Sequence, residues 1–185
     1  MKRHSPSRAV VLGAMAALVL LSAAAFVAFR WLYPGGVTMV TVAQTGFSVS
    51  YPSSWKVNGQ LQGPSDVVLL IRDPHPTSSY DPGLIVRRTA VDPYPLDQDI
   101  PGLLRANQFR YPDIRVLRHA HISVHGAKEA VLVVSEAQVE GQSGRIVDIV
   151  VRTPANVAYH LQAVAPPALL SDQTIDAIVN GFRVS

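Results

Sequence analysis

Valine, isoleucine and other β-forming residues dominate the chain after residue 36, in short runs where apolar and polar positions often alternate. Glycine, proline, asparagine and serine separate these runs, which is typical of short strands joined by turns. The predicted strands cover residues 37–43, 47–51, 66–72, 84–91, 114–124, 129–139, 145–153 and 157–164. Two glycines within residues 140–144 can supply the positive φ of a tight turn, so we expect a hairpin there and a largely antiparallel sheet.

Residues 96–109 and 171–182 have the spacing of helices instead. In the first segment, Leu103 and Phe109 supply apolar contacts, and an aspartate near the start can accept hydrogen bonds from the free amides. In the second, Ser171 is the predicted N-cap, and apolar residues repeat at helical spacing to form one stripe. Two helices packed on a mainly antiparallel sheet make an α+β fold.

The N-terminal region has a different pattern, because no charged residue occurs between Ala9 and Phe29. These 21 residues, at about 1.5 Å per residue, cover roughly the hydrocarbon thickness of a bilayer. Three basic residues precede this stretch and only Arg30 follows it closely, which favours a cytoplasmic N-terminus. The expected organisation is a cytoplasmic tail (1–8), a transmembrane anchor (9–33), a linker (34–36) and a domain (37–185) on the periplasmic or extracellular side of the cell membrane.

A cleavable signal peptide is the alternative interpretation of the same segment, since the alanines at 23–25 offer a small-residue cleavage site. Cleavable apolar regions are usually about 7–15 residues long, which favours the permanent anchor. The chain has no cysteine, so lipid attachment to a cysteine, disulfides and thiolate chemistry are excluded. Within the anchor, small residues such as Gly13 and Ala17 leave room for close helix packing and are candidate partner contacts in the bilayer.

The charge of the chain is concentrated at its N-terminus. The formal net charge is +3, but the first 36 residues hold four of the 16 Lys and Arg and none of the 13 Asp and Glu. The predicted exported domain is therefore nearly neutral, which excludes a phosphate-binding footprint for nucleic acid. Inside it, Arg87 with Arg88, and Arg115 with Arg118, either present positive charge to an acidic partner or simply occupy exposed strand faces.

The sharpest candidate for chemistry is a row of histidines in the predicted strand 114–124. His119 and His121 occupy alternate positions and share one face, with Cα atoms about 6–7 Å apart, so both rings can reach one Zn²⁺ or Cu²⁺. His125 continues the alternation but needs a bend near Gly126 to join them. The alternative is an amphipathic strand whose solvated face happens to be polar, and we predict no bound cofactor.

Two proline-rich loops, residues 73–83 and 92–101, carry tyrosines that are candidate partner contacts. Tyr80 and Tyr94 each offer a rigid ring with a hydroxyl, which gives contact area at low entropic cost. Alternatively, both rings pack on the domain's own surface.

Motifs of catalysis are missing from the sequence. Gly141-Gln-Ser-Gly144 has the wrong glycine spacing for a nucleophile elbow, and neither a phosphate-binding loop nor the helical histidine pair of metalloproteases occurs. We therefore expect a protein that is not an enzyme, with a hydrolase lacking a recognisable motif as the alternative.

The start and the end of the predicted domain resemble one family. The strand and turn Gly46-Phe-Ser-Val-Ser-Tyr-Pro-Ser-Ser-Trp-Lys56, with a Trp that can close over the sheet, and the C-terminal helix through Ile178 to Phe182 are similar to the PsbP-like family. The resemblance covers residues 41–184 and implies an α/β/α sandwich, shared with a Ran-binding protein. It also implies a non-catalytic domain that docks on a membrane redox complex and, in photosynthetic members, helps retain inorganic ions.

No functional residue of that family maps onto this chain, and the predicted anchor departs from the soluble plant proteins, so photosystem II itself is not implied. The sequence thus predicts a bacterial, membrane-anchored accessory or assembly subunit that binds a larger membrane protein complex, by analogy an electron-transport one. The alternative is an extracytoplasmic ligand- or metal-binding protein that uses the His119/His121 face.

Overall fold

The computed structural model describes residues 38–58, 66–76, 80–90 and 96–185, all within the compact unit Val37–Ser185. The predicted anchor 9–33, with Gly13 and Ala17, lies outside the described residues, as does Tyr94. Among the helices that are described, none combines the length and the apolar character needed to cross a bilayer.

The described residues form two antiparallel sheets and two helices. The strands are β1 (Met39–Gln44), β2 (Phe47–Pro52), β3 (Lys56–Val57), β4 (Val67–Arg72), β5 (Gly83–Ala90), β6 (Arg115–His121), β7 (Glu129–Val139), β8 (Gln142–Arg152), β9 (Val157–Ala165) and β10 (Arg183–Val184), and the helices are α2 (Leu96–Arg110) and α3 (Asp172–Gly181). The small sheet has the order β1-β2-β10, and the large one β3-β4-β5-β9-β8-β7-β6. The predicted α+β class and largely antiparallel sheet are confirmed.

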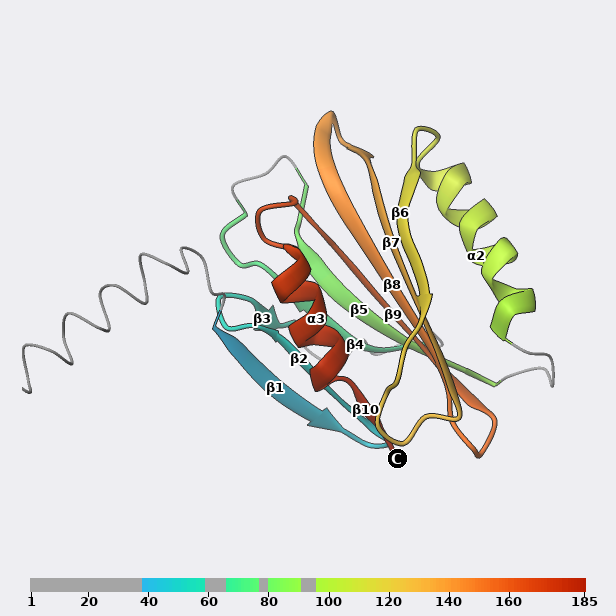
Figure 1. The fold of residues 1–185 in the computed structure, drawn as a ribbon. Helices are drawn as coiled ribbons and strands as arrows, with labels where there is room; N and C mark the ends of the chain where they lie inside the picture. Colours follow the sequence, from blue (N-terminus) through green and yellow to red (C-terminus); the bar gives the residue numbers. More distant parts are fainter. Residues whose placement is uncertain (1–37, 59–65, 77–79, 91–95) are drawn as a thin grey trace, which may run out of the picture. The chain divides into compact units, whose positions relative to one another are not determined.

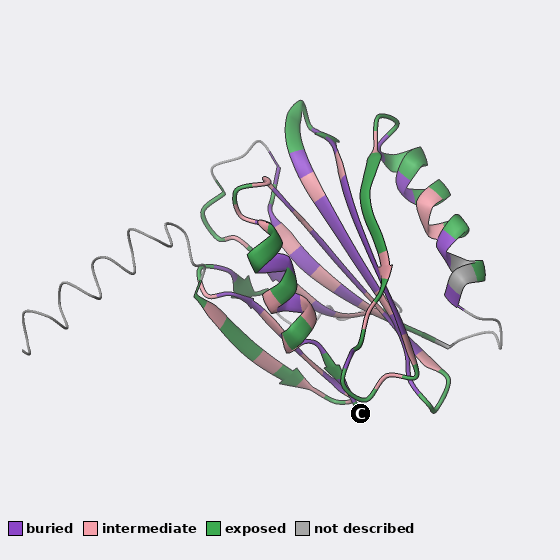
Figure 2. Cartoon of the chain, viewed as in Figure 1, coloured by how far each residue is buried: buried purple, intermediate pink, exposed green. Residues whose placement is uncertain are grey.

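The elements stack in three layers, with the large sheet in the middle (Figure 1). Helix α3 and the small sheet cover one face of it, and α2 lies on the other face. The central strands are largely buried because both of their faces are covered. At the sheet edges, β6 is mostly exposed and β1 has no buried residue (Figure 2).

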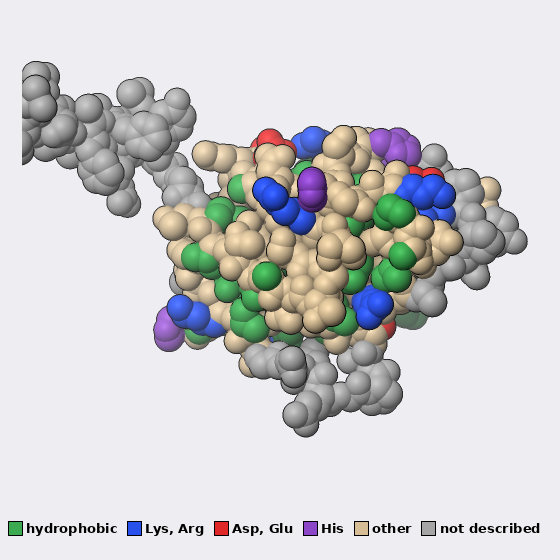
Figure 3. Space-filling view, turned by 90° about the horizontal axis from the view of Figure 1, so that it is seen from below, with side chains coloured by type: hydrophobic (Ala, Val, Ile, Leu, Met, Phe, Trp, Pro, Cys, Tyr) green, Lys and Arg blue, Asp and Glu red, His purple; other side chains and the backbone are tan. Residues whose placement is uncertain are grey.

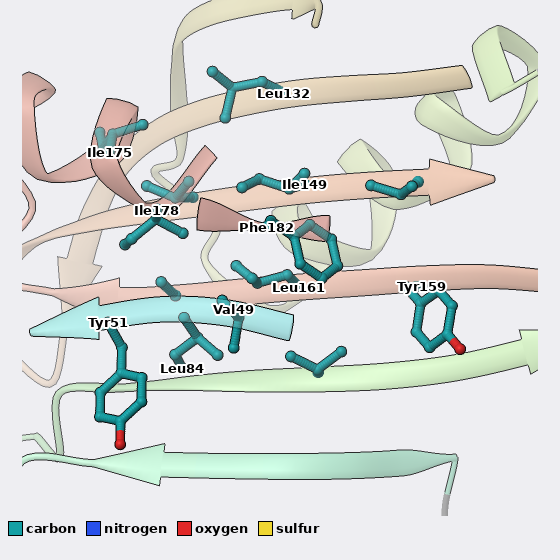
Figure 4. Packing of buried hydrophobic residues seen from close by; sticks show 14 of the residues in the cluster. Val49, Tyr51, Leu84, Leu132, Ile149, Tyr159, Leu161, Ile175, Ile178 and Phe182 are labelled. Atoms are coloured by element: carbon teal, nitrogen blue, oxygen red, sulfur yellow. The ribbon is translucent and has the colours of Figure 1, made fainter. Parts of the chain in front are cut away.

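The main core lies between the large sheet and the layer of α3 and β2. Leu132, Ile149 and Leu161, on neighbouring strands, face Val49 and Phe182 in this core (Figure 4). These side chains are all fully or almost fully removed from water, so their burial supplies the main apolar stabilisation of the fold. Trp55 of the family-like segment is buried in the same core.

Local sequence signals set several element ends. The Thr174 amide donates to Ser171 Oγ at 3.2 Å, which confirms Ser171 as the N-cap of α3. The predicted hairpin between β7 and β8 is also confirmed. Its two-residue turn uses Glu140 (φ 49°) and Gly141 (φ 81°), so the second predicted glycine, Gly144, belongs to β8 instead.

The prediction that Phe109 contributes to the core was wrong, because its side chain is 92% exposed. The buried face of α2 runs through Leu96, Ile100 and Asn107, which are spaced at helical intervals of four and seven residues. Phe109 follows Asn107 by two positions, about 200° around the helix, and therefore points away from the sheet.

Two phenylalanines on this fold provide a matched test of core packing. Phe182→Ala removes a ring that is 1% exposed and lies edge-on to Phe47, so the free energy of unfolding should fall by about 3–5 kcal/mol. Phe109→Ala makes the same chemical change at an exposed site and should alter stability by less than about 0.5 kcal/mol. Urea unfolding followed by circular dichroism measures both; equal effects would contradict the assigned core.

Candidate functional site

The face of the large sheet that carries α2 is only partly apolar. Leu96 and Ile100 of α2 pack on Val131 and Val133 of β7, which seats the helix toward the β7 side of the sheet. Beside this contact, the same face presents polar and charged side chains from β8, β9 and β5. Strands that are covered on both sides usually carry apolar residues on both, so these exceptions mark the place where a function is expected.

A carboxylate lies fully buried in the middle of this face. Asp148 of β8 has no exposed surface, and its Oδ2 accepts a hydrogen bond from Asn107 Nδ2 of α2 at 2.8 Å. Its Oδ1 accepts one from Gln162 Nε2 of β9 at 2.8 Å and lies 2.8 Å from His160 Nε2. These four residues form what we term the Asp148 cluster.

The cluster ties α2 to one position on the sheet. A buried carboxylate is strongly destabilising unless hydrogen bonds replace its hydration, and Asn107 is the partner that only α2 can bring. Gln162 Nε2 also lies 3.4 Å from Asn107 Oδ1, so the amide side chains support each other. Sliding or rotating the helix would leave Asp148 short of a donor, which fixes the register of α2.

Ser135 of β7 is another polar side chain of this face, but it does not pair with His160. Ser135 pairs with Ile146 and His160 with Val150, so the two residues lie on opposite sides of β8 and four positions apart along it, roughly 16 Å from each other. A serine nucleophile needs its base within hydrogen-bond reach, and Asp148 stands between the two instead. The arrangement acts as a support for α2, rather than as a triad.

A pocket of about 320 Å³ opens next to the Asp148 cluster and shares Gln162 with it. Its polar lining includes Arg72 of β4, Arg87 of β5, Arg110 of α2, Tyr80, Tyr111 and Gln162. Ile85 of β5 and Val164 of β9 add apolar surface. We call this hollow the α2-face pocket; its volume is within the range of ligand-binding clefts.

The tyrosines of the pocket belong to a small apolar cluster with Val139 and Ile146. Room for the Tyr80 ring depends on Gly144, where an added Cβ would lie 2.6 Å from Val139 Cγ2 and 3.1 Å from Tyr80 Oη. Burial, and secondarily the neighbouring Tyr111, raises the pKa of Tyr80 to about 12. The hydroxyl is therefore protonated at physiological pH.

The structure places His125 apart from the other two predicted histidines. His119 and His121 are exposed on edge strand β6, opposite Val133 and Val131, and share one face as predicted. The strand ends at His121, and His125 instead forms an isolated bridge with Arg183. Within the described part of the chain, no three His, Asp or Glu side chains gather as a metal site would require. On the face shown in Figure 3, histidines appear at separate places.

For Tyr80, the structure agrees with the alternative interpretation. Its side chain is only 6% exposed, so it packs on the domain's own surface and offers a partner one wall of a pocket. Sequence reasoning did not find Arg72 or Arg110, because the pocket forms only when β4, β5 and the end of α2 come together. The adjacent Arg87 and Arg88 were the one local signal of positive charge in this region.

Comparisons with solved structures place this architecture among known folds. The chain is similar to cyanobacterial PsbP (CyanoP) from Synechocystis sp. PCC 6803, with a TM-score of 0.58 and 13% identity, covering 82% of this chain and 95% of that one. It is similar to LpqN of Mycobacterium tuberculosis, with a TM-score of 0.56, 14% identity and coverage of 84% and 95%. For the Saccharomyces cerevisiae protein Mog1p, the TM-score is 0.56, the identity 11% and the coverage 80% and 96%.

These similarities confirm the PsbP-like fold that the sequence resemblance predicted, and at such low identity they show the fold alone. No protein-family model matches the chain, and a search of curated proteins found no match.

The Asp148 cluster predicts a large effect from removing its carboxylate. Asp148→Ala leaves the Asn107 and Gln162 donors buried without their acceptor, so the free energy of unfolding should fall by about 3 kcal/mol. Urea unfolding measures this change, and Asp176→Ala on the exposed side of α3 is the control, with less than about 0.5 kcal/mol expected. Asn107→Ala should lower the free energy of unfolding much less in the Asp148→Ala variant than in the wild type, because its hydrogen-bond partner is already gone. Additive effects of the two substitutions would contradict the cluster.

The raised pKa of Tyr80 predicts a loss of stability at alkaline pH. An unfolded tyrosine ionises near pH 10, whereas Tyr80 in the folded chain ionises near 12. The neutral phenol therefore contributes stability that is fully present below pH 10 and is lost as the pH rises from 10 to 12. Urea unfolding across this range should show a steeper fall in the free energy of unfolding for the wild type than for Tyr80→Phe. Parallel curves would contradict this assignment.

Proposed function

We propose that this chain is a membrane-anchored, non-catalytic accessory subunit that binds a protein of a larger membrane assembly through the α2-face pocket. The observation that carries the proposal is the pocket's lining of Arg72, Arg87, Arg110, Tyr80 and Tyr111. Arginine and tyrosine are enriched among the residues that contribute most binding energy at protein interfaces. An electron-transport assembly is the kind of partner that the PsbP-like resemblance favours.

Preorganisation supports a binding role for this pocket. The Asp148 cluster fixes α2 and therefore the position of Arg110 and Tyr111 at its end. Tyr80 and Tyr111 are already held in an apolar cluster, so a partner does not have to order them. Binding to a preformed surface avoids much of the entropic cost of immobilising side chains.

The predicted topology supports a partner in or near a membrane. The uncharged stretch from Ala9 to Phe29 is long enough to span a bilayer, and a tether confines the domain to the membrane surface. Confinement raises the effective concentration for a membrane-bound partner without any new contact. Protein binding also occurs within this fold, since Mog1p is a Ran-binding protein.

Site-specific photo-crosslinking in native membranes tests this function. A photoreactive residue at Asp81, which lines the pocket and is 64% exposed, should crosslink the full-length tagged chain to one defined membrane protein. Asp176 on α3 is the matched control, because it is 59% exposed and also pairs with an exposed arginine. Its crosslinks should not include that protein.

The proposal would be contradicted by identical crosslinks from the two positions, or by none from Asp81 in several mild detergents and in intact membranes. Gentle solubilisation and purification through the tag then measure whether the crosslinked protein co-purifies at stoichiometric amounts, as a subunit of one assembly should.

A further inference from the structure

The arginines of the α2-face pocket make longer contacts than a structural arginine of the same domain. Arg145, which is 16% exposed, donates to the Leu170 carbonyl at 2.9 Å, to Asp172 at 3.1 Å and to Glu136 at 3.2 Å. Both of its terminal nitrogens, Nη1 and Nη2, are therefore held by acceptors within the fold. Charge-assisted hydrogen bonds of this kind are usually about 2.7–2.9 Å long, and each guanidinium carries five N–H donors.

Arg72 and Arg87 are paired much more loosely. Arg72 Nη1 lies 3.7 Å from Asp81 Oδ2, and Arg87 Nε lies 3.8 Å from Asp66 Oδ2. Both distances exceed that of a hydrogen bond, and all four side chains are partly exposed. Such contacts contribute little stability, so most of the donors of Arg72 and Arg87 remain available to an incoming group.

Arg110 forms no ion pair with a carboxylate of the described residues. Its guanidinium lies over the Tyr111 ring, with Cζ 5.6 Å from the ring centroid. A cation–π contact of this kind holds the charge near the ring and does not occupy the N–H donors of the guanidinium. Arg110 lies in the last turn of α2, where its positive charge also interacts favourably with the helix dipole. That interaction requires a positive charge but no contact with Tyr111.

The charged lining of the pocket comprises these three arginines and two acidic residues, Asp81 and Glu140. The lining thus carries a net positive charge of one, and Arg110 has no carboxylate partner among the described residues, which points to an anionic ligand. The apolar walls formed by Tyr80, Tyr111 and Val164 strengthen this attraction, because a charge beside low-dielectric surface is less screened.

We infer that the α2-face pocket binds an acidic segment of the partner protein, with its Asp or Glu carboxylates held by Arg72, Arg87 and Arg110. The inference rests on the proposed function and adds the chemistry of the partner. Guanidinium groups bind carboxylates in a bidentate manner, and Ile85 and Val164 offer apolar surface to the carbon atoms of the acidic side chain. A bare inorganic anion would leave that apolar surface uncovered.

A peptide-binding experiment with the full-length chain in detergent micelles tests this inference. The probe is a short fluorescent peptide with paired glutamates, followed by anisotropy, and the same peptide with glutamines serves as the comparison. The glutamate peptide should bind at least about tenfold more tightly, since hydrogen bonds to charged groups are worth roughly a factor of ten or more. The affinity should fall as salt is raised.

Variants locate the binding on the pocket. Arg87→Gln and Arg110→Gln should each lower the affinity for the glutamate peptide about tenfold. The matched control is Arg88→Gln, because Arg88 follows Arg87 on β5 and therefore points to the opposite face of the sheet. It should change the affinity less than about twofold. Arg87→Lys keeps the charge without the bidentate geometry, so it should weaken binding as well.

Three outcomes would overturn the inference. They are equal affinity for the two peptides, equal weakening by the Arg88→Gln control, and binding of phosphate or acetate as tight as that of the glutamate peptide. The last result would identify a small anion, not a protein segment, as the occupant. The crosslink from Asp81 separates this failure from failure of the proposed function. If it persists in an Arg87→Gln/Arg110→Gln double variant, the protein partner stands and only its acidic chemistry is wrong.

Discussion

The burial of the Asp148 carboxylate in the central strand β8 constrains everything on the α2 face of the large sheet. Removing a carboxylate from water is so unfavourable that its two oxygens must find donors inside the protein, and they do so on both β9 and α2. Asn107 is the contribution of the helix. The hydrogen bond from Asn107 to Asp148 fixes the position of the end of α2. Arg110 and Tyr111 are thereby placed in the lining of the pocket.

The two faces of the large sheet differ in the kind of side chain that they need. Val147 and Ile149 of β8 turn into the main core under α3 and the small sheet, whereas Asp148 between them turns toward α2. The main core needs only apolar volume and tolerates conservative exchange, while the α2 face needs particular donors and acceptors. The main core therefore supplies most of the apolar stabilisation, and the α2 face sets the position of the candidate site.

Patterns local to the chain could be predicted, and contacts between distant segments could not. The strands, the Ser171 cap and the β7–β8 hairpin follow from periodicity and turn chemistry within a few residues. Asp148 and Asn107 are 41 positions apart, and their hydrogen bond exists only after α2 has packed on the sheet. For Tyr80 the sequence left two interpretations open, and only tertiary packing in one cluster with Tyr111 shows that the ring is buried.

The loose ion pairs of the pocket suit a reversible partner. Asp81 and Asp66 stay near Arg72 and Arg87 when no partner is bound, so the arginines are not left as isolated charges. An exposed pair of this kind is worth only about 0–1 kcal/mol, and a partner carboxylate with shorter, bidentate contacts can displace it at little cost. Asp81 and Asp66 thus compete weakly with the partner's carboxylates for the arginines. This competition favours reversible binding of the partner over permanent attachment. The proposed membrane tether would keep the domain close to its partner, so a contact of modest affinity would be sufficient for the proposed accessory role.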